Sequence, residues 1–287
     1  MEMPLVSVVC LCYNQERFVE EAIRSVLNQS YKNVQLIVVD DASTDNSANV
    51  IRSVIQACPG IQFLALTENL GNCKAFNRGL VLAKGSFLID LAADDVLLPN
   101  RIEEGVQVLR EKGEGYGIHF SDAAIIDEYG THLYNHSDRF PHQAVPQGDV
   151  YARVIRQYFI CPPTVMFTRQ VADVLGGYDE ALSYEDFDFW VRSSRAFNYV
   201  YSPEILVKKR VSKNSLSSKQ FKLFSKHARS TYRVCQKILR LNNSGEEQQA
   251  LHQRIMYEIK LNLRLLNPGV ALEFFFLMIR NRGKKYT

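Results

Sequence analysis

Apolar and polar positions recur with two different periods over about the first hundred residues. Short runs rich in β-branched and other apolar residues predict buried strands over residues 6–13, 34–41, 61–68 and 86–92. Apolar side chains three and four positions apart predict amphipathic helices over residues 16–29, 46–58 and 73–84. This alternation, with short connections, is typical of an α/β fold with a Rossmann-like, mostly parallel sheet and helices on both faces.

The second half of the chain is less regular. Its patterns predict, in order, a strand with a turn, a strand with a helix, and a helix led by acidic residues, over residues 116–130, 159–182 and 184–197. From about Lys213 onward, amphipathic helix dominates. We therefore divide the chain into residues 1–100, residues 101–212 and a helical extension over residues 213–287.

Composition and charge exclude several classes of protein. The 287 residues are 46% hydrophobic and 23% charged, as is ordinary for a soluble globular protein. A net charge of +3 without a basic block in the body of the chain argues against a nucleic-acid partner. The first residues lack the basic start of a signal peptide, and the six cysteines fit neither a zinc site nor a disulfide framework. We therefore expect reduced thiols and a cytoplasmic protein.

Polar residues follow the ends of three predicted strands. They are Tyr13 and Asn14, Asp40 and Asp41, and Asp94 and Asp95. Ligands of open parallel sheets bind beyond the carboxyl ends of the strands, so these residues are expected on one rim. Asp40 and Asp41 could accept hydrogen bonds from a base or a ribose, while Asp94 and Asp95 suit a hard cation. The alternative is that both pairs only form turns.

A third acidic pair, Glu185 and Asp186, opens the helix predicted over residues 184–197. Carboxylates at a helix N-terminus are favourable with the helix dipole, which is one explanation for the pair. A carboxylate in this place could also serve as a general base, if it lies within hydrogen-bond reach of an attacking hydroxyl.

Four segments in this order resemble a family 2 glycosyltransferase with a GT-A fold, of the type that builds bacterial surface polysaccharides. They read VSVVCLCYNQERFVEEAIRSVLNQSY, VQLIVVDDASTDNS, NLGNCKAFNRGLVLAKGSFLIDLAADDVLLPNRI and PPTVMFTRQVADVLGGYDEALSYEDFDFWVR. The resemblance runs from about Val6 to about Ser217. It implies that residues 1–100 are the nucleotide-sugar-binding half and residues 101–212 the acceptor-binding half of one GT-A domain.

The resemblance implies a role for each matching residue on the donor side. Tyr13 would lie against a uracil or thymine ring, and Asp41, with Asp40, would bind the base or the ribose. Asp94 matches the last Asp of the family's Asp-x-Asp motif and would bind Mn²⁺ or Mg²⁺ on the diphosphate, with Asp95 beside it. The rest of the expected nucleotide-sugar site is Asn14, Glu16, Asn69, Gly71, Lys74 and Asn77.

The resemblance also implies the chemistry. Asp186 would be the base of an inverting transfer of a hexosyl or N-acetylhexosaminyl group. It would take the proton of an acceptor hydroxyl, which attacks the anomeric carbon while the nucleoside diphosphate leaves from the opposite face. The expected donor is a UDP-sugar, and the expected acceptor is a glycan or a lipid-linked glycan. Glu185, Trp190 and His119 are acceptor-side candidates, and a place in the core or on the surface is the alternative for Trp190 and His119.

Three positions depart from the family pattern. Ala92 replaces the first Asp of the Asp-x-Asp motif, Phe76 stands where a basic residue is common, and Ser212 stands where a His is often found. Lys74 could compensate for Phe76. Basic residues cluster near the missing His at Lys208, Lys209, Arg210 and Lys213. Our hypothesis is that these cations carry part of the diphosphate's charge and weaken the dependence on metal.

The departures keep alternatives open. A dTDP-rhamnose transferase with weak metal dependence fits the missing His and Ala92. A non-catalytic nucleotide-binding relative is a second alternative, against which Asp94 and Asp186 argue. A sugar-1-phosphate nucleotidyltransferase would need a Gly-rich, basic loop after the first strand, and the sequence CYNQERF is not such a loop. The sequence specifies neither the sugar nor the acceptor.

The last residues read VALEFFFLMIRNRGKKYT. The apolar run is too short to span a bilayer, which takes roughly 20 residues. One interpretation is a helix packed on the body, which could also pair across a homodimer. The other is an interfacial helix whose basic end lies on an anionic membrane, peripheral to the inner face of the plasma membrane. That basic end would comprise Arg280, Arg282, Lys284 and Lys285.

Overall fold

The computed structural model of the chain describes residues 3–140, 144–212 and 226–283. Its strands are β1 (Val6–Cys12), β2 (Val34–Asp40), β3 (Gln62–Ala65), β4 (Phe87–Ala92), β5 (Val96–Leu97), β6 (Tyr116–Ile126), β7 (His132–Asn135), β8 (Met166–Thr168) and β9 (Asn198–Arg210). Its α-helices are α1 (Val19–Leu27), α2 (Ser47–Ala57), α3 (Asn72–Leu82), α4 (Arg101–Lys112), α5 (Tyr151–Arg156), α6 (Arg169–Leu175), α7 (Asp186–Ser194), α9 (Lys226–Leu241), α10 (Gly245–Arg264) and α11 (Pro268–Gly283). The predicted strands and helices of the first hundred residues are all confirmed, with shorter ends.

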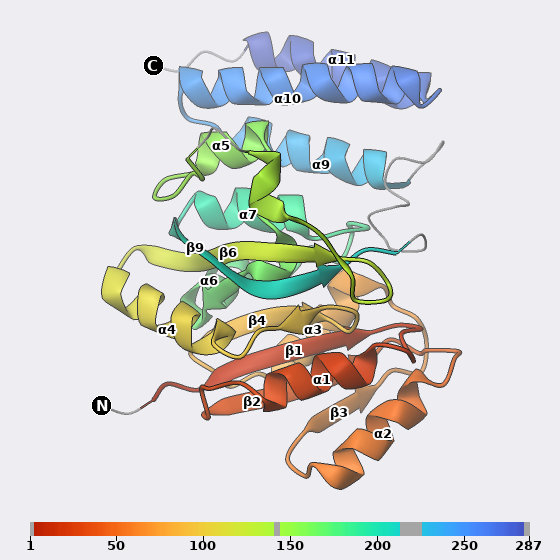
Figure 1. Ribbon diagram of the computed structural model, residues 1–287. Helices are drawn as coiled ribbons and strands as arrows, with labels where there is room; N and C mark the ends of the chain where they lie inside the picture. The colour runs from red at the N-terminus through yellow and green to blue at the C-terminus, as the bar shows by residue number, and fades with distance from the viewer. Residues whose placement is uncertain (1–2, 141–143, 213–225, 284–287) are drawn as a thin grey trace.

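One nine-stranded sheet runs through the molecule in the order β3-β2-β1-β4-β8-β6-β9-β5, with β7 paired to β6 (Figure 1). The pairs β1·β2, β1·β4 and β2·β3 are parallel, as the alternating pattern predicts. Beyond β4 the sheet is mixed, because β8 runs antiparallel to both β4 and β6, while β9 runs parallel to β6. Strands β1 to β4 are therefore all parallel, whereas the strands of the second half pair in both directions.

The register of the parallel strands creates one common rim. Cys12 of β1 is paired with Asp40 of β2, and Leu11 is paired with Ala92 of β4. These three strands therefore end side by side. The residues that follow them, including Tyr13, Asp41 and Asp94, leave the sheet at the same edge, which confirms the expected rim.

Successive residues of β1 contribute to two different cores, because side chains alternate across a strand. Val8 and Cys10 belong to the core that contains apolar residues of α1, α2 and α4. Val9 belongs to the core that contains apolar residues of α3, α6 and α7 and extends to the C-terminal helices. Both faces of the sheet are therefore covered.

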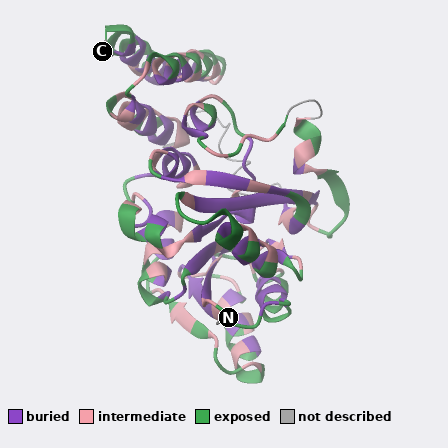
Figure 2. Cartoon of the chain, turned by 90° about the vertical axis from the view of Figure 1, so that its left-hand side faces the viewer, coloured by how far each residue is buried: buried purple, intermediate pink, exposed green. Residues whose placement is uncertain are grey.

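The helices α9, α10 and α11 stack beyond α5 and α7, with α10 and α11 outermost (Figure 1). Each of the three shows both buried and exposed residues (Figure 2). Polar contacts fix them to the body: Arg195 forms an ion pair with Glu247 at 2.8 Å, and the Tyr151 hydroxyl donates to Asn242 Oδ1 at 2.9 Å. In the described parts of the chain, no helix is both long and apolar enough to cross a bilayer.

Candidate active site

The loops that follow β1 and β2 are joined by hydrogen bonds. Asn14, which has a φ of 55°, accepts from the Thr44 backbone N–H at 2.8 Å. Its own N–H donates to the Ser43 hydroxyl at 2.9 Å. Glu16 accepts from the Asn46 N–H at 2.7 Å. Asn14 and Glu16 therefore shape the rim, while the neighbouring Tyr13 ring is 47% exposed and free to contact a ligand.

Asp40 and Asp41 are both buried, and both carboxylates accept hydrogen bonds. Asp40 accepts from the Ser43 hydroxyl at 2.5 Å. Asp41 accepts from the backbone N–H groups of Leu70 at 2.7 Å and Gly71 at 2.9 Å. Asp41 thus holds the loop before α3, and only the remaining lone pairs of the two carboxylates are available to a nucleoside.

The N-terminus of α3 opens onto the same rim. Gly71 is its N-cap residue, with a φ of 84°, and a Cβ added there would meet nothing within 4 Å. Asn69 donates to the Asp41 carbonyl at 3.2 Å, and Lys74 lies half-buried in the first turn. Asn77 instead forms two hydrogen bonds of 2.9 Å with the backbone of Tyr178. Gly71, Asn69 and Lys74 therefore border the rim, whereas Asn77 joins two loops.

Asp94 and Asp95 have different surroundings. Asp95 is 4% exposed, and its Oδ1 accepts from the Arg210 backbone N–H at 2.8 Å. Asp94 is half-buried beside the exposed Ala92, and the Arg210 side chain donates to its carbonyl rather than to its carboxylate. Burial raises the pKa of Asp94, while Arg210 and Lys209 oppose the rise. The Asp94 carboxylate is therefore the one that remains open toward the rim.

Residues of the two halves and of the C-terminal helices enclose a cavity of about 140 Å³. Its lining includes Asn72, Tyr158, Glu185, Asp186, Trp190, Lys209 and Arg254. The Tyr158 and Trp190 rings lie 5.3 Å apart and supply flat apolar surface. The Arg254 guanidinium is paired with Glu258 at 2.9 Å, yet its buried Nε–H has no partner among the described residues. Apolar walls with a few convergent polar groups are typical of a small-molecule site.

Asp186 is the first residue of α7 and faces this cavity. Burial raises its pKa well above the ordinary value, and the neighbouring carboxylates of Glu185 and Asp90 raise it further. Lys209 opposes the rise. A raised pKa makes the carboxylate a stronger base, which suits proton abstraction from a hydroxyl.

Lys209, on β9, interacts both with the pair Asp94 and Asp95 and with Asp186. Burial disfavours its charge, but electrostatic attraction by Cys161, Asp95, Asp186 and Asp94 raises its pKa. Among the other cations of the cluster, Arg210 is engaged by Asp94 and by Glu21 at 2.7 Å. Lys213 lies outside the described residues. The described structure therefore brings one cation of the cluster, Lys209, into the cavity.

Asp90 is an acidic residue of β4 that the sequence analysis does not single out. It lies two positions before Ala92 and so on the same face of the strand. Its Oδ2 accepts from the Tyr178 hydroxyl at 2.9 Å, and the Phe76 ring stacks on Tyr178 at 4.2 Å. Burial raises the pKa of Asp90 to about 8, and Glu185 adds to the rise. The signal was available, because an Asp interrupts the apolar run FLIDLA.

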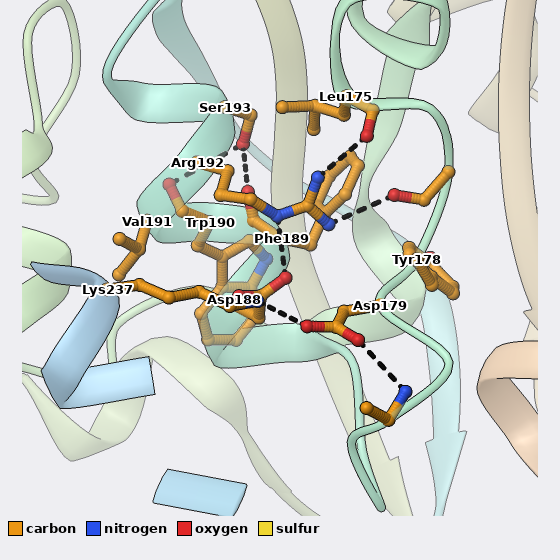
Figure 3. A network of polar contacts seen from close by, with 12 residues as sticks. Leu175, Tyr178, Asp179, Asp188, Phe189, Trp190, Val191, Arg192, Ser193 and Lys237 are labelled. Atoms are coloured by element: carbon orange, nitrogen blue, oxygen red, sulfur yellow. Dashed lines mark hydrogen bonds and ion pairs between the residues drawn. The ribbon is translucent and has the colours of Figure 1, made fainter. Parts of the chain in front are cut away.

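A second acidic residue of α7, Asp188, fixes the helix in place (Figure 3). Its carboxylate pairs with Arg192 at 2.6 Å and with Lys237 of α9 at 2.5 Å. Lys237 also pairs with Asp179 at 2.5 Å. The N-terminal end of α7, which carries Asp186, is thereby tied to the C-terminal extension.

The other acceptor-side candidates have different positions. Trp190 is 3% exposed and belongs to the core, and it also lines the cavity. His119 is completely buried: its ring contacts Arg101 at 3.3 Å and the Ser202 hydroxyl at 2.9 Å. His119 is not part of the cavity lining. Burial and Arg101 lower its pKa, so it lies in the core as a neutral ring.

The donor set for a metal is small. Within residues 3–140, 144–212 and 226–283, no three His, Cys, Asp or Glu side chains are grouped so as to hold an ion. Among positions 92, 94 and 95, Asp94 offers a half-exposed carboxylate, whereas Ala92 has none and Asp95 is buried and accepts from the Arg210 backbone. Mg²⁺ and similar cations are often held by one or two carboxylates together with substrate phosphates. The residues present fit such a shared site and not a cage made of protein alone.

Comparison with known proteins places the chain among glycosyltransferases. The family model described as Glycosyl transferase family 2 matches residues 7–173. The putative teichuronic acid biosynthesis glycosyltransferase TuaG of Bacillus subtilis is 28% identical over 240 residues, which cover 83% of this chain and 90% of TuaG. An uncharacterized glycosyltransferase of Rickettsia prowazekii is 29% identical over 212 residues, and that match covers 72% of this chain and 64% of the relative's length.

Solved structures share the fold. TarS 1–349 of Staphylococcus aureus in complex with UDP-GlcNAc superposes with a TM-score of 0.68 at 15% identity, covering 99% of this chain and 93% of that one. The mannosyltransferase PcManGT of Pyrobaculum calidifontis, in complex with GDP-Man and Mn²⁺, gives a TM-score of 0.67 at 17% identity. That match covers 100% of this chain and 77% of PcManGT. The expected GT-A fold is thus confirmed.

Proposed function

Because the chain belongs to glycosyl transferase family 2, we propose that it is an inverting enzyme that transfers a sugar from a nucleoside diphosphate to a hydroxyl of a glycan or lipid-linked glycan. The observation that carries the proposal is the position of Asp186. It lies in a cavity lined by residues of both halves of the chain and of the C-terminal helices, and burial and neighbouring carboxylates raise its pKa.

The rim would bind the donor. The Tyr13 ring offers a face for the base, and Asp40 and Asp41 offer their remaining lone pairs to the base or the ribose. Gly71 lets the diphosphate approach the N-terminus of α3, where backbone N–H groups favour anions. A UDP-sugar is the donor we favour, and the acceptor would belong to the synthesis of a bacterial surface polysaccharide, as the name of TuaG suggests.

The acceptor would enter the cavity beside Trp190 and Tyr158. Asp186 would accept the proton of its hydroxyl while the oxygen attacks the anomeric carbon from the face opposite the diphosphate. Glu185 lies at the N-cap of α7, next to the base, and would orient the acceptor or the sugar. A Mg²⁺ or Mn²⁺ ion held by Asp94 and the diphosphate would act as a Lewis acid on the leaving group.

The direct test compares Asp186→Asn with Asp173→Asn, an exposed carboxylate on α6. We expect Asp186→Asn to lower transfer from a panel of UDP-sugars by about 10²–10⁴-fold, since general-base catalysis contributes that much. Calorimetric binding of UDP, dTDP and GDP should stay unchanged in both variants. An Asp186→Asn protein with full transfer activity would refute the assignment of the base.

Lys209 supports a second candidate, a transferase with weak metal dependence such as the dTDP-rhamnose type. Its ammonium interacts electrostatically with Asp95, Asp186 and Asp94, so it would supply positive charge near the proposed diphosphate site. We expect nucleotide binding to survive chelation in the wild type but not in Lys209→Met. Lys208→Met, at the adjacent position of β9, should behave like the wild type. If all three proteins lose nucleotide binding equally on chelation, the metal supplies the charge and this candidate fails.

A further inference from the structure

Helix α11 is apolar on two opposite faces. One face packs inward through Val270, Ala271, Phe274, Leu277 and Met278. The other carries Leu272, Phe275, Phe276 and Ile279, which are 53%, 44%, 54% and 51% exposed. The spacing i, i+3, i+4, i+7 places these four on one stripe. An exposed stripe of large apolar side chains is normally covered by a partner or a membrane, and the outer face of α11 is such a stripe.

Leu266, in the turn between α10 and α11, is a further exposed apolar residue that precedes the stripe in the chain. It is 66% exposed and has a φ of 53°, the left-handed region in which Gly or Asn is preferred at a helix C-terminus. A leucine there adds backbone strain and buries little of its side chain within the chain. The stability of the folded chain therefore does not account for a leucine at position 266, whereas contact of its side chain with the acyl region of a bilayer would.

Exposed basic residues are in excess on α11 and on the end of α10 that precedes it. Between residues 259 and 283 the chain has one acidic residue, Glu273, and four basic ones. The basic residues Lys260, Arg264, Arg280 and Arg282 are all exposed. Aromatic and aliphatic side chains flanked by Lys and Arg are typical of a helix that lies in the interface of an anionic bilayer. A second copy of the chain would place its own cations against these, since the same segment faces itself across a two-fold axis.

We propose that the outer face of α11, with Leu266, docks on an anionic lipid bilayer. The four apolar side chains of the stripe enter the acyl boundary, and the arginines remain at the level of the headgroups. This inference concerns binding alone, so it stands or falls independently of the proposed transfer reaction.

The experiment is flotation of the full chain with vesicles of phosphatidylcholine alone or with about one third phosphatidylglycerol. We expect binding to the anionic vesicles that weakens in high salt. Phe275→Ser with Phe276→Ser should lower the partition coefficient at least about tenfold, because buried apolar area sets the binding strength. Arg280→Gln with Arg282→Gln should lower it about thirtyfold, on anionic vesicles only. Val81→Ser, which removes an apolar side chain that is 81% exposed on α3, is the matched control and should change nothing.

Leu266→Gly separates a loss of vesicle binding from a loss of folding, because this variant should be more stable than the wild type. It removes the exposed side chain and relieves the positive φ, so it should raise the midpoint of thermal unfolding while weakening vesicle binding. Equal flotation of wild type and stripe variants, or no flotation, would overturn the proposal. So would light scattering that shows a dimer which Phe275→Ser with Phe276→Ser dissociates, because a second copy would then cover the stripe.

Discussion

Asp90 is a carboxylic acid in the sheet that accepts one hydrogen bond, from the Tyr178 hydroxyl, and forms no ion pair with a cation among the described residues. In an unfolded chain its pKa is about 3.9, whereas burial and Glu185 raise it to about 8 in the folded protein. Between these values the folded state holds a proton that the unfolded state has lost. The stability contributed by protonated Asp90 is therefore fully present below about pH 4 and is lost as the pH rises through 8.

Asp90→Asn keeps the shape of the side chain and removes its charge. We expect the free energy of unfolding of the wild type to fall, relative to that of Asp90→Asn, by about 1 kcal/mol or more between pH 5 and pH 9, since one pKa unit corresponds to ~1.4 kcal/mol. Urea unfolding at pH 5, 7 and 9 measures the difference, with Asp173→Asn as the exposed control. Parallel pH profiles of the two proteins would show that Asp90 is already ionised in the fold.

At the scale of single elements, α7 shows how the proposed base, Asp186, is positioned. Asp188 is 1% exposed and is held by Arg192 from the same helix and by Lys237 from α9. Removing one partner of a buried ion pair leaves charge uncompensated, and here Arg192 compensates part of it.

We therefore expect Lys237→Met to lower the free energy of unfolding by about 1–3 kcal/mol. It should also lower kcat, since α7 carries Asp186 at its N-terminus. Lys260→Met, an exposed lysine on α10, is the control, and denaturant unfolding with single-turnover kinetics gives both quantities. A loss of stability with no change in kcat would show that Asp186 is positioned without this contact.

The patterns of single strands explain why the rim could be predicted from the sequence and strand β9 could not. The rim was predictable because Val6–Cys12 and Val34–Asp40 are continuous apolar runs, and parallel strands must end at one edge. Strand β9 was not predictable, because Pro203 and Glu204 interrupt its apolar pattern at the point where its register with β6 shifts. Lys209 reaches the cavity only through that pairing, so its precise neighbours could not be read from local spacing.

The sequence also did not allow us to predict which hydrogen bonds the carboxylates of the rim form. The sequence predicts that Asp41 binds a nucleoside, and the structure adds that its two oxygens also accept from the backbone of Leu70 and Gly71. The path of a loop some 30 residues later decides these two hydrogen bonds. Asp94 and Asp95 are adjacent in the chain, yet only the structure distinguishes the open carboxylate from the one that accepts from Arg210. The residue types predicted a charged site, and the loops decide which groups remain available in it.

At the scale of the whole molecule, the C-terminal helices are continuous with the catalytic body. They line the cavity through Arg254, join its core through Cys235 and Phe274, and form the ion pair between Glu247 and Arg195. Contacts of this kind predict one cooperative unfolding transition.

Two buried thiols can check that prediction. Cys10 of β1 and Cys235 of α9 are both completely buried, one in the sheet and one in the extension. We expect both to become reactive toward a thiol reagent at the same denaturant concentration, as read by mass spectrometry of the labelled peptides. Labelling of Cys235 well before Cys10 would instead identify the extension as a unit that opens by itself.

The position of Trp190 has an optical consequence. It is the single tryptophan of the chain, it is 3% exposed, and it lines the cavity against Tyr158. All indole fluorescence of the protein therefore originates at one wall of the proposed acceptor site, while a nucleoside on Tyr13 and Asp40 would meet no indole. The emission spectrum is a built-in, label-free signal that separates occupancy by acceptor from occupancy by donor.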